Sequence, residues 1–197
     1  MMNFCPFQRR LMVDLTIKKE MIEIISSMKG KTLKSIEGDY LPKYKVFMEL
    51  VRFNMGQFAV EVYSYEEGVK WFWTGDKLID DEATCFTVKK ADTKNRYYPK
   101  GWRPVQFLKD EKVSEIIIVR DLIKTNRGDE ILVDSGFVVR TNENVYTFSK
   151  CDLSSYNIYM NESDKIDMHY SVKKAREDCS EPESNLKATV KRDYIFI

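Results

Sequence analysis

The feature that most constrains the fold is a succession of short segments rich in β-branched and aromatic residues, separated by turn-forming residues. The clearest example is residues 129–152, DEILVDSGFVVRTNENVYTFSKCD, where apolar runs are interrupted at 134–136 and 142–144. Aspartate, asparagine and glycine suit tight turns, whereas valine, isoleucine, tyrosine and phenylalanine favour strands. We therefore predict three antiparallel strands joined by two turns in this part of the chain.

Similar patterns predict strands over most of the remaining sequence. We expect them in 31–38, in 44–65 as two strands joined near 54–56, and in 66–76, 83–91, 113–124, 156–161, 165–172 and 186–197. The last of these ends in Tyr194, Ile195, Phe196 and Ile197, whose exposure to water would leave a large apolar area unburied. The tail is therefore expected to dock as a final strand.

One segment has the periodicity of an amphipathic helix instead. Apolar residues recur every three or four positions across 14–29, while lysine and glutamate fill the other positions. Asp14 or Thr16 can cap the first turn, and Gly30 follows the last turn, where a left-handed residue is favoured. The apolar positions are Ile17, Met21, Ile24, Ile25 and Met28.

These elements predict an α+β fold that is predominantly antiparallel β. A chain of 197 residues with no alternation of strands and helices is best interpreted as a single domain rather than a doubly wound nucleotide-binding fold. We expect a curved barrel-like sheet or a sandwich, with the N-terminal amphipathic helix packed on it. Residues 1–11 and 173–185 are predicted to be mobile, the latter as a loop or a short solvated helix, because 173–185 holds no large apolar residue.

Charge and cysteine content restrict the location and the ligands. The formal net charge is +1, so the whole molecule has no strong electrostatic attraction to nucleic acid or to an anionic membrane. The four cysteines form no C-x-x-C pair, and the chain has one histidine, so no zinc site is predicted. We expect reduced thiols in a cytoplasmic protein, with no signal peptide, no membrane span, no cofactor and no metal.

Catalytic patterns are weak in this sequence. His169 is the one histidine and lies in a predicted strand, where a structural role is the usual one. Cys85 and Cys151 are the formal candidates for a nucleophile, but buried cysteines generally act as small apolar residues. The acidic run 80–82, together with Asp92, is the basis for a third reading as a metal-dependent hydrolase or nuclease.

The most unusual segment is 95–107, NRYYPKGWRPVQF, which combines aromatic and cationic side chains and has no carboxylate. Such a segment suits a protein partner, since tyrosine, tryptophan and arginine dominate interface hot spots. It also suits nucleic acid, through phosphate contacts and base stacking. The structural alternative is a packed loop over one end of the sheet, with its charge balanced by the acidic segment 177–184. The candidate binding residues are Arg96, Tyr97, Tyr98, Lys100, Trp102 and Arg103.

The sequence thus predicts a non-enzymatic cytoplasmic interaction protein that acts through a surface including 95–107. A protein partner is expected first, such as a toxin or a host factor. The alternative is a nucleic-acid-binding protein that uses the same segment, and the third reading is the metal-dependent hydrolase or nuclease.

Overall fold

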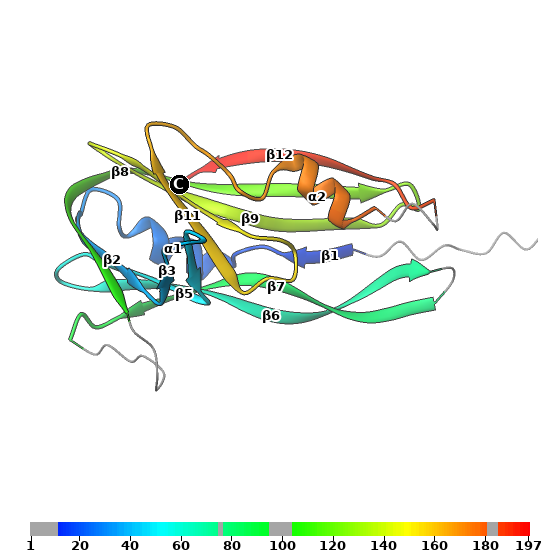
Figure 1. Cartoon of the computed structure of the whole chain (residues 1–197), viewed down its shortest axis with the longest axis horizontal. Helices are drawn as coiled ribbons and strands as arrows, with labels where there is room; N and C mark the ends of the chain where they lie inside the picture. Colours follow the sequence, from blue (N-terminus) through cyan, green and yellow to red (C-terminus); the bar gives the residue numbers. More distant parts are fainter. Residues whose placement is uncertain (1–11, 75–76, 95–103, 181–184) are drawn as a thin grey trace, which may run out of the picture.

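The computed structural model describes residues 12–74, 77–94, 104–180 and 185–197, and strands predominate there, as predicted (Figure 1). The expected mobile segment 1–11 lies outside these ranges. In chain order the elements are β1 (Met12–Leu15), α1 (Lys19–Ser26), β2 (Thr32–Gly38), β3 (Tyr40–Leu41), β4 (Val46–Met48), β5 (Leu50–Asn54), β6 (Ala59–Thr74), β7 (Lys77–Ala91), β8 (Val105–Thr125), β9 (Glu130–Thr141), β10 (Val145–Lys150), β11 (Asn157–Ser163), α2 (Val172–Asp178) and β12 (Ala188–Phe196).

The strands form one open sheet. Its order is β3-β4-β11-β10-β9-β8-β2-β5-β6-β7, with β1 beside β9 and β12 beside β8. The ladders of the described strands are antiparallel, except that β1 and β9 are parallel. The expected barrel-like sheet is wrong, because the end strands β3 and β7 do not pair with each other. β3 is only two residues long, and β7 has α1 as its neighbour instead.

Strand β8 connects two parts of this sheet. Its first residues pair with β2, and 113–124 pair with β9. The β9 pairing is irregular between Val113 and Glu115 and between Val119 and Arg120, and such bulges bend a strand. Figure 1 shows β8, β9 and β12 on one side of the molecule and β6 and β7 on the other.

Aromatic side chains fill the space between these two parts of the sheet. Phe53 of β5 lies 5.1 Å from Phe148 of β10, measured between ring centroids, and Phe86 of β7 lies 5.7 Å from Phe137 of β9. Phe137 and Phe148 stack on each other at 4.8 Å. Edge-to-face and stacked pairs of buried rings stabilise a core beyond the area they bury. β7 is thereby fixed on its inner face to β9 and β10.

Helix α1 is shorter than the sequence predicted. It covers Lys19–Ser26, whereas Met12–Leu15 forms β1, so the helix predicted from residue 14 is wrong in its first part. Asp14 caps no helix, because its carboxylate accepts hydrogen bonds from the amide and hydroxyl of Thr16. The N-cap is Lys18, which makes no side-chain capping bond. Apolar residues of the helix still pack on the main core, including Ile25, which is fully buried.

The turn predicted at 134–136 is also wrong, because β9 runs through it without interruption. Gly136 is needed there for space rather than for a turn. A Cβ atom at this position would lie 2.3 Å from the carbonyl oxygen of Phe148 and 2.8 Å from Cε of Met168. The second predicted turn is confirmed, since the amide of Thr141 donates to the carbonyl of Asn144 between β9 and β10.

Gly136→Ala is expected to lower the free energy of unfolding by about 2–4 kcal/mol, because backbone atoms cannot move aside as a flexible side chain would. Urea denaturation measures the change. Gly68→Ala is the matched control, since a Cβ atom there has no neighbour within 4 Å, and its effect should stay within about 0.5 kcal/mol. Equal losses for the two variants would contradict the steric explanation.

The C-terminal part of the chain agrees with the sequence only in part. Residues 165–171 form no strand, and Val172 starts α2. Ile166 and Met168 pack across the outer face of β8 and β9 instead. In the segment 173–185, α2 occupies the first positions with Ala175 buried, while 181–184 lie outside the described residues. The predicted last strand is confirmed as β12.

Candidate binding cleft along strand β7

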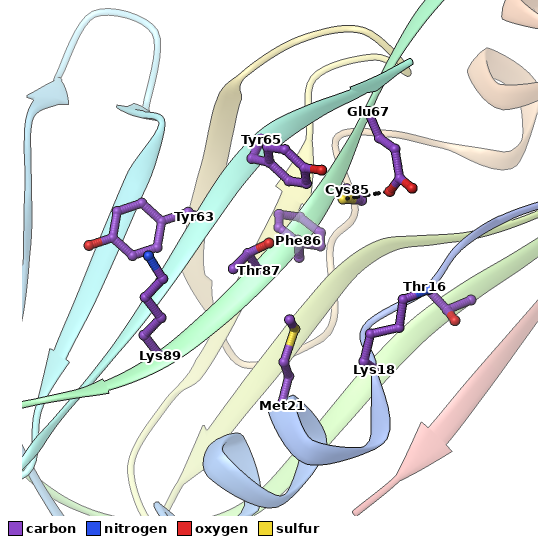
Figure 2. A pocket seen from close by; sticks show the side chains of 10 residues that line it. All are labelled: Thr16, Lys18, Met21, Tyr63, Tyr65, Glu67, Cys85, Phe86, Thr87 and Lys89. Carbon is purple, nitrogen blue, oxygen red and sulfur yellow. Dashed lines mark hydrogen bonds between the residues drawn. The ribbon is translucent and has the colours of Figure 1, made fainter. Parts of the chain in front are cut away.

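A cleft of about 510 Å³ lies between the β6–β7 hairpin and the segment that leads from β1 into α1 (Figure 2). This volume is typical of ligand sites, which range over roughly 300–1,000 Å³. Its lining side chains come from three places: the N-terminal segment with α1, strand β6 and strand β7. They are Thr16, Lys18, Met21, Tyr63, Tyr65, Glu67, Cys85, Phe86, Thr87 and Lys89.

The position of the cleft follows from the edge of β7. Successive residues of a strand point to opposite faces of the sheet, yet Cys85, Phe86 and Thr87 all line the cleft. The register places most of this lining on one face of the hairpin, because Tyr65 pairs with Cys85 and Tyr63 pairs with Thr87. β7 has β6 on one side and is the last strand of the sheet path, so the cleft lies where this face reaches the outer edge of β7, beside α1.

The wall formed by β6 is aromatic and partly accessible. Tyr65 is 48% exposed, and Tyr63 is half-buried. The hydroxyl of Tyr63 donates to the Glu61 carboxylate at 2.7 Å, and the Lys89 ammonium lies 5.0 Å from the centroid of the Tyr63 ring. Accessible tyrosine is enriched at protein-binding hot spots.

The thiol in the cleft is buried and hydrogen-bonded to a carboxylate. Cys85 is 6% exposed, and its Sγ lies 3.5 Å from Oε2 of Glu67, to which it donates. Burial, with a smaller contribution from the adjacent Glu67 carboxylate, raises the pKa of Cys85 to about 11. A reactive cysteine needs a lowered pKa and a nearby cation or general base. Cys85 therefore acts as a small apolar residue with a fixed hydrogen bond.

A buried lysine lies behind the ring of Phe86. The Nζ atom of Lys150 donates to the carbonyl oxygen of Thr84 and, at 2.7 Å, to its hydroxyl, and it lies 5.2 Å from the centroid of Phe86. Lys150 is 0% exposed, and burial lowers its pKa to about 7. Its ammonium group faces strand β7 from the core, so it helps to fix Thr84 and Phe86 at the edge.

The candidate residues chosen from the sequence lie elsewhere. Arg96, Tyr97, Tyr98, Lys100, Trp102 and Arg103 all fall in 95–103, outside the described residues, and so does the acidic stretch 181–184. Among the described cations on either side of 95–103, Lys109 binds the Glu162 carboxylate at 2.9 and 3.0 Å, and Lys90 lies over the ring of Phe58. Lys89, which precedes this segment in the chain, lines the cleft.

The possible catalytic residues do not assemble. His169 stacks on Tyr159, with ring centroids 4.5 Å apart, and the described partner of the Cys85 thiol is Glu67. Residues 80–82 are consecutive in β7 and pair with β6. Within the described ranges, no group of three histidine, cysteine, aspartate or glutamate side chains could hold a metal ion.

Sequence reasoning missed most of the cleft. The signal that could have found its β6 wall is the alternation of Tyr63, Tyr65 and Glu67 on one face of a predicted strand. Nothing in the sequence shows that β7 lies at the edge of the sheet or that α1 lies beside it.

Comparison of the chain with protein-family models, curated proteins and solved structures finds no match. No helix in the described part of the chain combines the length and the apolar character needed to cross a membrane. The interpretation of the cleft therefore depends on its own geometry.

Proposed function

We propose that the protein is a non-enzymatic interaction protein that binds a polypeptide partner in the cleft along β7. The observation that carries this proposal is a preformed cleft beside α1, at the edge of β7 that pairs with no strand of the sheet path, with the accessible aromatic ring of Tyr65 on its wall and the ammonium of Lys89 beside Tyr63. A few residues, often tyrosine or tryptophan, supply most of the binding energy in many protein interfaces.

The chemistry of the lining supports binding rather than catalysis. Its thiol has a raised pKa and is bonded to Glu67. The remaining polar side chains in the cleft are two threonines, two tyrosines and two lysines. General acid–base catalysis at neutral pH normally uses a group whose pKa lies near 7 and which reaches the substrate. Lys150 has such a pKa but lies behind Phe86 and is 0% exposed.

Binding is tested with random linear heptapeptides displayed on phage, which are selected against the purified full chain and then synthesised. Tyr65→Ala is expected to raise the dissociation constant of the selected peptides by about tenfold or more, because it removes the accessible ring from the wall of the cleft. Fluorescence polarisation with labelled peptides measures the constants.

Tyr44→Ala is the matched control, since Tyr44 is also exposed, at 59%, and lies outside the cleft in the turn between β3 and β4. The selected peptides should bind Tyr44→Ala as tightly as they bind the wild type. Failure to select any peptide, or peptides whose binding is unchanged by Tyr65→Ala, would refute the proposed function.

The readings that rest on 95–107 stay predictions from the sequence. A partner surface built from Arg96, Tyr97 and Trp102, as well as nucleic-acid binding by the same segment, depends on residues outside the described ranges. The metal-dependent hydrolase or nuclease also stays a prediction. No described contact favours either alternative over the cleft.

A further inference from the structure

The hydrogen-bonding direction of β7 shows what its free edge offers to the cleft. In an antiparallel ladder, alternate residues direct both backbone groups toward the neighbouring strand, and the residues between them direct both groups away. The amide of Thr84 donates to the carbonyl of Leu153 at 2.9 Å, and the carbonyl of Thr84 accepts from Lys150. Both partners lie outside β6, so Thr84 faces away from β6.

Strand β6 shows independently which residues of β7 direct their backbone groups away from the hairpin. The amide of Ser64 in β6 donates to the carbonyl of Glu49 at 2.8 Å, on the side of β5. Ser64 pairs in register with Phe86, so this pair makes no hydrogen bonds between β6 and β7. Phe86 and Val88 therefore share the direction of Thr84, and their N–H and C=O groups point to the free edge.

These backbone groups have no partner in the described part of the chain. No hydrogen bond links Phe86 or Val88 to a backbone or side-chain group outside the β6–β7 ladder. Both residues are buried, at 2% and 3% exposure. Backbone donors and acceptors that are buried without a partner are rare, because each loses its hydration without compensation. At Thr84, further along the same edge of β7, another segment of the chain reaches the strand and the backbone groups have hydrogen-bond partners.

We infer that the partner binds as an extended peptide that adds to β7 as an extra strand and hydrogen-bonds to the backbone of Phe86 and Val88. This inference rests on the proposed function and specifies its mode. The peptide lies between the edge of β7 and the start of α1, with Met21 opposite Phe86 and Thr87 (Figure 2). Addition of a strand to an exposed edge is a recurrent way of recognising peptides, with pockets beside the edge selecting alternate side chains.

Charge indicates an acidic peptide. The cleft is lined by the ammonium groups of Lys18 and Lys89 and by one carboxylate, Glu67, which is engaged with the Cys85 thiol. A carboxylate on the peptide would find an opposite charge at either lysine, whereas a basic peptide would meet two like charges. We therefore expect aspartate or glutamate to be enriched among the selected peptides.

Two measurements on the selected peptides test strand addition. Amide hydrogen exchange followed by NMR on the full chain should show that saturating peptide slows exchange at Phe86 and Val88 by about tenfold or more. The amides of Cys85 and Thr87, which point to β6, should change far less. In the peptide, N-methylation should weaken binding by about tenfold at alternate positions and leave the intervening positions nearly unchanged.

The charge is tested with Lys89→Gln, which should weaken binding of the acidic peptides severalfold and reduce its dependence on salt. Lys43→Gln is the matched control, because Lys43 lies over the ring of Tyr44 as Lys89 lies over Tyr63. Peptides that need Tyr65 but show neither alternating protection nor an alternating N-methyl pattern would overturn strand addition and leave the proposed function intact. Absence of any Tyr65-dependent peptide would refute both.

Discussion

Asp121→Ala is expected to lower the free energy of unfolding by about 3–5 kcal/mol. The Asp121 carboxylate is 0% exposed and accepts two hydrogen bonds from the Arg192 guanidinium, at 2.7 and 2.6 Å, and one from the Ser135 hydroxyl. Its removal leaves a buried guanidinium without its counter-ion in the ladder between β8 and β12. Urea denaturation, with wild type and variant measured at the same pH, gives the loss.

An exposed ion pair provides the control for this effect. Lys34 and Asp110 are paired with side chains that are 51% and 77% exposed, so Asp110→Ala should change stability by less than about 1 kcal/mol. The double replacement Asp121→Leu with Arg192→Met removes both buried charges and should be less destabilising than Asp121→Ala alone. A double variant that is less stable than Asp121→Ala would show that the pair contributes more than the avoidance of an unpaired charge.

Local patterns predicted the elements whose burial follows from neighbours in the sequence. The strand-forming residues of Val145–Lys150 and of 194–197 predicted β10 and β12. The burial differs from a simple alternation, because all six residues of β10 are buried, whereas Tyr194 and Phe196 of β12 are exposed. Gly136 shows the limit of this reasoning. The residues around Gly136 are typical of a turn. Its conformation is decided instead by the close approach of the Phe148 carbonyl, which is not a neighbour in the sequence.

Long-range pairing decided the features that the sequence could not predict. Asp14 and Leu15 fall within the predicted helix 14–29, yet Met12–Leu15 pairs with Glu130–Val133 of β9 and forms β1. A contact across more than a hundred residues thus overrides the local helical periodicity, which survives only in Lys19–Ser26. The edge position of β7 has the same origin, because it depends on which strands the rest of the chain places beside it.

The candidate cleft also combines a feature that the local sequence predicts with features that depend on long-range pairing. The sequence contains the alternation of Tyr63, Tyr65 and Glu67, so one face of β6 could be predicted to be aromatic and acidic. The sequence does not show which residues of β7 direct their backbone groups away from β6. The hydrogen bonds that Thr84 makes with Leu153 and Lys150 show this in the structure. The prediction for 95–107 rests on its aromatic and cationic composition, whereas a binding edge is defined by backbone groups that carry no signature in the sequence.

The free energy of unfolding is expected to rise with pH because of one side chain, Lys150. Burial lowers its pKa from 10.5 to about 7 in the folded protein. The unfolded chain therefore binds this proton more tightly than the folded protein, so the free energy of unfolding increases as pH rises from about 7 toward 10.5. Between about pH 6.5 and 8.5 the contribution of Lys150 should increase by about 2 kcal/mol.

Lys150→Met removes the titrating group while keeping a long apolar side chain in the core, so this part of the pH dependence should disappear. Urea denaturation of wild type and variant at several pH values measures it as a difference between the two curves. That difference is needed because burial raises the pKa values of Cys85 and Cys179 to about 11 and about 12, which lowers stability as their unfolded thiols begin to ionise. Parallel curves for wild type and Lys150→Met would mean that Lys150 stays protonated in the fold. Lys34→Met, at a lysine whose side chain is 51% exposed, is the control for replacing a lysine by methionine.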